Sequence, residues 1–113
     1  MDCIFCRIIA GEIPSKILHQ DEDVIAFPDI NPVASTHLLI VPRKHIPSLA
    51  QLSEEDLPLI SHMVDIANQL ARREGIAEDG YRLVINCGEQ GRQVVPHLHI
   101  HLIGGRRLGD ELG

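Results

Sequence analysis

The sequence predicts an α+β protein: an antiparallel five-stranded sheet with one main helix and a short N-terminal helix. Five short segments have the composition of β-strands, and one longer segment has the apolar period of a helix. Three strand segments precede the long helix and two follow it, an order that favours an antiparallel sheet. The 113 residues leave no room for a second core, so we expect one domain over residues 1–113.

The N-terminal third contains a helical turn and two strands. Apolar residues stand at positions 4, 5, 8 and 9, which predicts a short helix over residues 4–9 that Gly11 ends. Residues 16–20 and 23–27 are predicted strands, because polar residues 21–22 separate two runs of strand composition.

A turn and a buried strand follow. Pro28 and Pro32 bracket the turn and remove backbone donors there. Residues 37–41 form an apolar run that stops at Pro42, which is typical of a buried strand.

The main helix is predicted from a three- and four-residue apolar period. Its members are Leu57, Ile60, Val64, Ala67 and Ala71. Gly75 provides the stop. Pro58 must lie in the first turn, so Asp56 is a better N-cap candidate than Ser53.

The last two predicted strands are residues 81–86 and 94–103, with a polar loop between them and Gly104-Gly105 at the end. The second strand contains His97-Leu98-His99-Ile100-His101. Alternate side chains of a strand point to opposite faces, so the three imidazoles would share one face. Besides a merely polar face, this pattern indicates either metal ligands or catalytic imidazoles, and the spacing alone does not separate those two.

Composition restricts the partners. The net charge of −6 argues against polymeric nucleic acid or an anionic membrane surface, although a local site for one small anion stays open. No apolar stretch reaches the length of a membrane span and no signal peptide is evident, so we expect a cytoplasmic protein. In a reducing compartment the Cys3-x-x-Cys6 spacing favours metal or redox chemistry over a structural disulfide.

The histidine pattern resembles the signature of the histidine-triad (HIT) superfamily of nucleotide hydrolases and transferases. Further motifs resemble the Hint branch, in the same order and over nearly the whole chain. They are Ile4-Phe5-x-x-Ile8-Ile9, Glu12-Ile13-Pro14, Phe27-x-Asp29-Ile30-x-Pro32, Thr36-His37-x-Leu39-x-Val41-Pro42, Lys44-His45-Ile46, Tyr81-Arg82-x-Val84-x-Asn86 and Gly104-Gly105-Arg106.

The resemblance implies a HIT-like fold whose sheet extends across a homodimer, and a purine nucleoside phosphoramidase. Such an enzyme cleaves the P–N bond of an adenosine or guanosine 5′-monophosphoramidate. His99 would attack the phosphorus and form a nucleotidyl-histidine that water hydrolyses. His101 would hydrogen-bond a phosphate oxygen, His37 would orient the imidazoles, and catalysis would require no cofactor.

The resemblance also implies a nucleotide site. Asp29 would bind the ribose hydroxyls, although by itself an Asp between two prolines is more often a turn-forming residue. The base would lie against an apolar wall, whose members could otherwise be core: Ile4, Phe5, Ile8, Phe27 and Ile30. The phosphate would be bound by His99 and His101, with Asn86, Gln93 and the backbone of Val94; Asn86 could instead cap a loop.

One segment departs from the family pattern. Where members commonly have Gly-Gly-Gln-Ser, this chain has Gly91-Arg92-Gln93-Val94. Val94 has no hydroxyl to help protonate a leaving amine, so we expect an intact site with altered turnover or leaving-group preference.

The resemblance finally implies a structural Zn²⁺ site formed by Cys3, Cys6, His45 and His97; the alternative is that both cysteines are reduced thiols. Cys87 has no partner in this scheme and is expected to be a small buried residue. His19 and His62 are assigned no chemistry. Two other functions stay open: a dinucleoside polyphosphate hydrolase or nucleotidyltransferase, and a non-enzymatic nucleotide- or zinc-binding adaptor.

Overall fold

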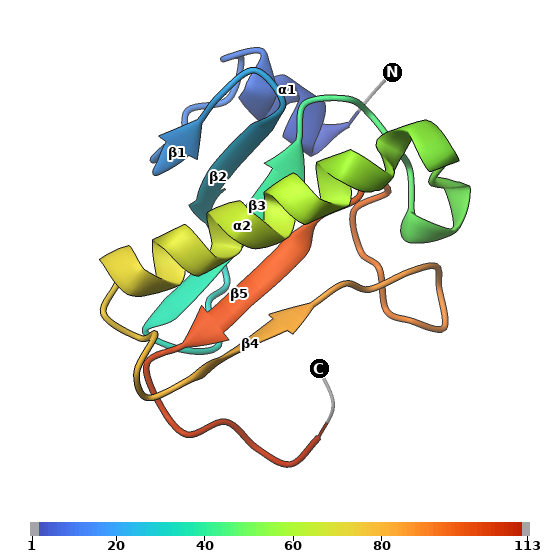
Figure 1. Ribbon diagram of the computed structural model, residues 1–113. Coiled ribbons are helices and arrows are strands. Elements are labelled where there is room, and N and C mark those ends of the chain that lie inside the picture. Colours follow the sequence, from blue (N-terminus) through green and yellow to red (C-terminus); the bar gives the residue numbers. More distant parts are fainter. Residues whose placement is uncertain (1–2, 112–113) are drawn as a thin grey trace.

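The computed structural model describes residues 3–111 and contains one five-stranded antiparallel sheet in the order β1-β2-β3-β5-β4 (Figure 1). The strands are β1 (His19–Gln20), β2 (Val24–Pro28), β3 (Thr36–Pro42), β4 (Tyr81–Val84) and β5 (Ile100–Gly104). The helices are α1 (Ile4–Ile9) and α2 (Leu57–Arg73), and two short 3₁₀ turns, Leu49–Gln51 and Glu54–Asp56, precede α2. The predicted fold class is confirmed.

The two faces of the sheet carry two different apolar clusters. Figure 1 shows α2 lying across one face, and the main core forms between that helix and one set of alternating strand residues, including Val24, Ala26, Leu38 and Ile40. The next residues along the same strands point to the other face, where they pack with Phe5 of α1. Period-two alternation in β2 and β3 thus builds both layers from apolar residues alone.

The start of the last strand was predicted wrongly. Residues 94–103 were expected to be strand, but β5 begins at Ile100, so His97 and His99 precede it. Proline explains the late start, because neither Pro96 nor Pro42, which the register of β3 and β5 places opposite Leu98, has an N–H for a ladder. The N–H of His97 donates to the carbonyl of Val95 at 2.8 Å instead, and that of Leu98 to Ile46 at 2.7 Å.

Other boundaries differ by a few residues. β1 covers only two of the five residues predicted for it, and β4 ends at Val84 rather than at residue 86. β2 and β3 extend to Pro28 and Pro42, each one residue beyond its predicted end. A proline can be the last residue of a strand, because it lacks only the N–H donor and its carbonyl can still accept a hydrogen bond.

α2 begins where it was predicted to begin, but its N-cap residue makes no side-chain hydrogen bond to the helix. Asp56 is the N-cap residue and Pro58 lies in the first turn. The Asp56 side chain makes no cap bond to α2; its Oδ2 accepts a bond from the Ser53 hydroxyl at 2.9 Å, and its Oδ1 accepts one from Lys44 Nζ at 2.8 Å. Both residues therefore act at this terminus, in the turn before the helix. Within residues 3–111, no helix has the length and apolar character needed to cross a bilayer.

His19 and His62, which were assigned no chemistry, share a carboxylate. Asp21 Oδ2 lies 2.7 Å from His19 Nε2 and 2.8 Å from His62 Nε2. Asp21 Oδ1 accepts the backbone N–H groups of Asp23 and Val24, both at 2.8 Å. Burial alone would raise the pKa of Asp21, but these four hydrogen bonds outweigh it and hold that pKa well below its usual range. The β1–β2 turn is thereby joined to α2.

We predict that Asp21→Ala lowers the free energy of unfolding by about 2 kcal/mol, because four donors lose their acceptor. Urea denaturation at pH 7 measures the loss. Glu22→Ala, in the same turn and exposed, is the control and should change stability by less than about 0.5 kcal/mol. Equal effects of the two changes would show that the carboxylate does not join turn and helix.

Candidate active site and metal site

The three histidines keep the predicted alternation although two of them precede the strand. Leu98, Ile100 and Leu102 lie in the core beneath α2. His97 and His99 point to the opposite layer, where the ring of Phe5 meets each edge-on, with centroids 5.8 and 5.0 Å away. The His101 ring lies 4.9 Å from that of His99.

The surroundings of His99 fix which nitrogen carries its proton. Its Nδ1 lies 2.7 Å from the carbonyl oxygen of His97, and because a carbonyl can only accept, Nδ1 must be the protonated nitrogen. Burial lowers the pKa of His99, against smaller opposing effects of that carbonyl and of Asp29, so the ring is neutral at pH 7. Its Nε2 therefore has a free lone pair and no bonding partner among residues 3–111. This is the nucleophilic form of imidazole.

His101 is bonded to His37 of the neighbouring strand. The register places Leu39 of β3 opposite His101, and His37 Nε2 lies 2.9 Å from His101 Nδ1. Burial is the main cause that lowers the pKa of both rings; for His101, the neighbouring rings of His99 and His37 add to it and the value is about 4. Both rings are neutral at pH 7.

Asp29 lies at the edge of this cluster. Its Oδ1 accepts the N–H of Asn31 at 2.8 Å, which is the turn-forming role. Its Oδ2 is 3.4 Å from His37 Nε2 and 4.0 Å from His101 Nδ1. One oxygen thus supports the turn while the other faces the histidines. The ribose contact predicted for Asp29 stays a prediction.

The expected apolar wall divides into core and surface. Phe5 and Phe27 are buried and pack edge to face with ring centroids 5.6 Å apart, while Ile8 is half-buried beside them. Ile4 and Ile30 expose 45% and 87% of their surface. The two phenylalanines are thus buried, whereas the two isoleucines keep apolar surface available for a ligand. The base contacts predicted for all five residues stay predictions.

Three side chains of the predicted phosphate loop bond to backbone or face solvent. Asn86 Nδ2 donates to the carbonyl of Gly91 at 2.8 Å, in agreement with the loop-cap alternative. Gln93 Nε2 donates to the carbonyl of Pro47 at 2.7 Å, and its Oε1 accepts the N–H of Gly88 at 2.9 Å. Val94 is 86% exposed. Their nucleotide contacts stay predictions.

This loop has an unusual backbone at Arg92. Its φ of 64° is in the left-handed region, which disfavours residues with a Cβ and suits glycine. The family pattern has glycine at this position, so the substitution retains a glycine conformation at a steric cost.

The loop borders a hollow of about 460 Å³, lined by Gly88, Glu89, Arg92, Gln93, Val94 and Pro96. Another hollow of about 410 Å³ lies near Arg43 and His62, and no predicted site residue lines it.

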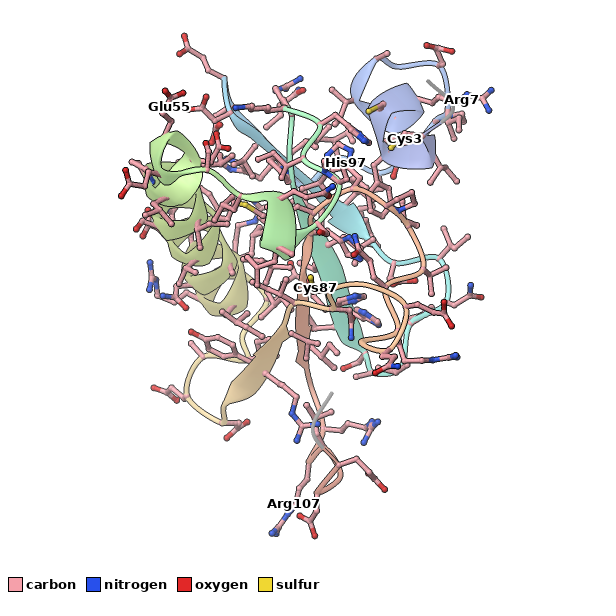
Figure 2. The ribbon with its side chains drawn as sticks, turned by 90° about the vertical axis from the view of Figure 1, so that its right-hand side faces the viewer. Cys3, Arg7, Glu55, Cys87, His97 and Arg107 are labelled. Atoms are coloured by element: carbon pink, nitrogen blue, oxygen red, sulfur yellow. The ribbon has the colours of Figure 1, made fainter. Side chains whose placement is uncertain are left out.

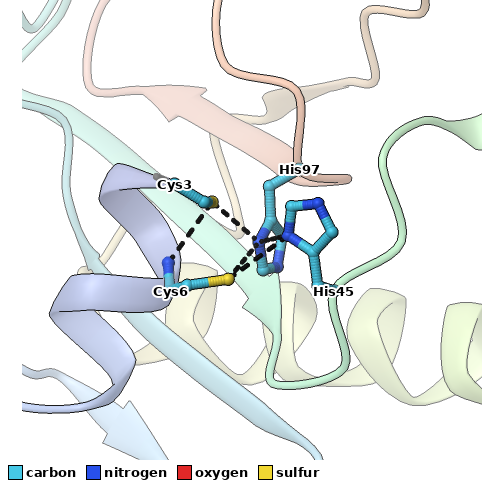
Figure 3. Close-up of side chains that lie close together, drawn as sticks. All are labelled: Cys3, Cys6, His45 and His97. Atoms are coloured by element: carbon cyan, nitrogen blue, oxygen red, sulfur yellow. Dashed lines mark hydrogen bonds between the residues drawn. The ribbon is translucent and has the colours of Figure 1, made fainter. Parts of the chain in front are cut away.

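The four predicted zinc ligands converge at one point (Figure 3). Their donor atoms all lie within 4.8 Å of one another. His97 Nδ1 is 3.4 Å from Cys3 Sγ, 3.6 Å from Cys6 Sγ and 3.1 Å from His45 Nδ1. Such separations are close to those around a tetrahedral Zn²⁺ whose ligands lie at about 2.0 to 2.3 Å.

Hydrogen bonding at His97 also fits a metal ligand. His97 Nε2 donates to the carbonyl of Pro42 at 2.8 Å, so the lone pair is on Nδ1, the atom that faces the two thiols. A ligand histidine whose other nitrogen donates to a carbonyl is the usual arrangement in zinc sites. Figure 2 shows Cys87 well apart from Cys3 and His97. Cys87 is half-buried rather than buried as expected.

Three contributions to these sites were missed because they come from backbone atoms. The carbonyl of His97 bonds to His99 Nδ1, the carbonyl of Pro42 orients His97, and the N–H of Val33 bonds to His37 Nδ1 at 3.2 Å. Every residue type has these groups apart from the proline N–H, so no sequence signal could have identified them.

Comparison with known proteins gives consistent matches over the full chain. A family described as "Scavenger mRNA decapping enzyme C-term binding" matches residues 2–110. A purine nucleoside phosphoramidase of Escherichia coli (strain K12) is 49% identical over 98% of this chain and 93% of its own length. A 14 kDa zinc-binding protein of Zea mays is 46% identical over 93% of this chain and 83% of its own. The crystal structure of a HIT family hydrolase from Legionella pneumophila Philadelphia 1 superposes with a TM-score of 0.96 at 44% identity, covering 99% of this chain and 100% of that one.

Because burial lowers the pKa values of the buried histidines, we expect the folded state to lose stability at pH values well above those at which carboxylates titrate. Between pH 6.5 and about 4, an unfolded chain protonates His101 while the folded chain does not, so stability is complete above 6.5 and falls as the pH decreases. We predict a loss of about 2 kcal/mol from this group between pH 7 and pH 5. Urea denaturation at both pH values measures it. His101→Gln should show a smaller pH-dependent loss, and an unchanged one would contradict the assignment.

Proposed function

From the premise that this chain belongs to the histidine-triad (HIT) family, we propose that it is a purine nucleoside phosphoramidase. Its substrate would be an adenosine or guanosine 5′-monophosphate joined to an amine through a P–N bond. The observation that carries this proposal is the state of His99, a buried neutral imidazole with Nδ1 bonded to a carbonyl and Nε2 free. A nucleophile of this kind needs no further base to activate it.

In the proposed reaction, His99 Nε2 attacks the α-phosphorus and the P–N bond breaks. The leaving nitrogen takes a proton from solvent and departs as an amine, while the imidazole becomes a cationic nucleotidyl-histidine. The carbonyl of His97 stabilises that charge through the existing bond to Nδ1, which does not have to reorganise. Water then attacks phosphorus and loses a proton to solvent, the P–Nε2 bond breaks, and His99 regains its lone pair as the nucleoside monophosphate leaves. His101 would donate to a phosphate oxygen, with His37 orienting it.

The nucleotide would lie between Asp29 and the exposed apolar residues. The Asp29 Oδ2 atom is the part of that carboxylate not used by the turn, which supports its role with the ribose hydroxyls. Exposed Ile4 and Ile30 would contact the base from the side that Phe5, Ile8 and Phe27 support. Asn86, Gln93 and the backbone of Val94 would act on the phosphate side.

We also propose a structural Zn²⁺ held by Cys3, Cys6, His45 and His97, and a homodimer. The metal would fasten α1 to the segment before β5, and it has no step in the reaction because His99 supplies the nucleophile. β4 is an edge strand whose four residues are half-buried, which supports extension of the sheet by a second copy. We expect the protein to act in the cytoplasm.

The first test is hydrolysis of adenosine 5′-phosphoramidate by the wild type and by His99→Ala. We predict measurable release of AMP by the wild type and a loss of at least about 1,000-fold in kcat/KM in the variant, because the covalent route disappears. Rapid quenching in alkaline denaturant, which preserves the acid-labile P–N bond, followed by mass spectrometry should find one nucleotidyl group on the His99 peptide.

His19→Ala is the matched control, since this histidine lies outside the cluster and should leave kcat/KM within about twofold. A wild type that cleaves only dinucleoside polyphosphates would indicate the polyphosphate hydrolase. Nucleotide binding without turnover in either protein would indicate the adaptor. This outcome is relevant because Val94 has no hydroxyl to help protonate the leaving amine.

The metal site has its own test. We predict about one Zn²⁺ per chain after purification in metal-containing medium, and its loss in Cys6→Ser with a fall of roughly 3 kcal/mol or more in the free energy of unfolding. Elemental analysis and urea denaturation measure the two quantities. Cys87→Ser is the control and should retain the metal. Zinc at full occupancy in Cys6→Ser would refute this ligand set.

A further inference from the structure

A second group of metal-binding side chains lies in the candidate active site. Donor atoms of Asp29, His37 and His101 fall within 4.8 Å of one another, as those of the proposed zinc site do. By distance alone this group could hold a divalent cation. It could equally be a chain of hydrogen bonds that sets which nitrogen of His101 carries a proton. The two possibilities differ in the protonation of His37.

The backbone N–H of Val33 determines that protonation. It lies 3.2 Å from His37 Nδ1, and because an N–H can only donate, Nδ1 must supply a lone pair. Burial lowers the pKa of His37, so the ring has one proton and that proton is on Nε2. A metal bound at His37 Nε2 would require the proton to be on Nδ1. Two N–H donors, those of Nδ1 and Val33, would then face each other without an acceptor. The Val33 bond therefore disfavours a metal here.

The proton on His37 in turn determines that on His101. His37 Nε2 donates across 2.9 Å to His101 Nδ1, which must accept. His101 is neutral, so its single proton is on Nε2. Residues 3–111 provide no hydrogen-bond partner for that N–H. A neutral N–H donor without a partner among residues 3–111, on a ring 4.9 Å from that of His99, fits an anionic phosphate oxygen, whereas the opposite tautomer would present a lone pair and repel it.

We propose that Val33 is a positioning residue whose backbone N–H fixes the tautomers of His37 and His101, so that His101 presents Nε2–H to the substrate's phosphate. That the ligand of His101 is a phosphate rests on the proposed function, whereas the tautomers of His37 and His101 are argued independently of it. The side chain of Val33 is 54% exposed and belongs to neither apolar cluster. Its contribution therefore comes from the backbone.

Arg106 bonds to the other polar backbone group of Val33, its carbonyl. Its Nε and Nη2 donate to the carbonyl of Val33 at 3.2 and 3.0 Å. The pairing of Thr36 with Gly104 brings the end of β5 beside the start of β3, as Figure 1 shows. Gly105 allows the close approach: its φ is +96°, and a Cβ there would lie 1.9 Å from Ser35 Oγ. Both polar backbone groups of Val33 are thus bonded, which fixes where its N–H points.

The test compares Val33→Pro, which lacks the N–H, with Val33→Ala, which retains it. Imidazole ¹⁵N shifts of the wild type at pH 7 should show protonated Nε2 and unprotonated Nδ1 for both His37 and His101. In Val33→Pro the shifts should move toward a mixture of tautomers. The kcat for adenosine 5′-phosphoramidate should fall about fivefold, roughly what one neutral hydrogen bond contributes, while KM stays within about twofold.

The controls separate this effect from damage to the loop. Val33→Ala should match the wild type in shifts and kcat. Arg106→Ala should move the shifts in the same direction as Val33→Pro but less, and Arg107→Ala, whose side chain bonds to none of residues 3–111, should not move them. Protonated Nδ1 on His101 in the wild type, or unchanged tautomers in Val33→Pro, would overturn the proposal. Correct tautomers in a wild type without phosphoramidase activity would refute only the proposed function.

Discussion

The hydrogen bond from His99 Nδ1 to the carbonyl of His97 is the constraint on which the candidate active site depends. It places the proton on one side of a buried ring and leaves the lone pair on the other. The carbonyl can hold that position because the surrounding segment is bonded at two further points: the His97 ring donates to Pro42, and the N–H of Leu98 donates to Ile46. These bonds replace the strand pairing that the prolines prevent, so the departure from regular β-structure determines the geometry of the proposed nucleophile, His99.

His97 connects the two sites through one residue. Its side chain offers Nδ1 to the proposed zinc, and its main chain orients His99. Phe5 makes a second connection, since it lies between Cys3 and Cys6 in sequence and packs against both His97 and His99. A metal that orders α1 would therefore also order one side of the nucleophile. In the proposed arrangement the metal would have a mechanical role, because the reacting lone pair would belong to His99.

The sequence predicted the fold class and the five strands, because these follow from the order and composition of its segments. It predicted the face on which the histidines lie, because that follows from alternation. It also predicted that Cys3 would lie with Cys6, His45 and His97, although only through the resemblance and not through spacing. It did not predict where β5 begins, since that depends on a cross-strand proline. Nor did it predict the Asp21 bonds to His19 and His62, or the backbone groups of Val33 and Pro42, which become neighbours of the histidines only after folding.

The distribution of protons on the histidines is the central claim, and neutron diffraction of a deuterated crystal at pH 7 tests it most directly. The account predicts deuterium on His99 Nδ1, on His97 Nε2 and on His101 Nε2, with none on His99 Nε2. Deuterium on His99 Nε2 would contradict it, since that ring would then have no lone pair with which to attack phosphorus.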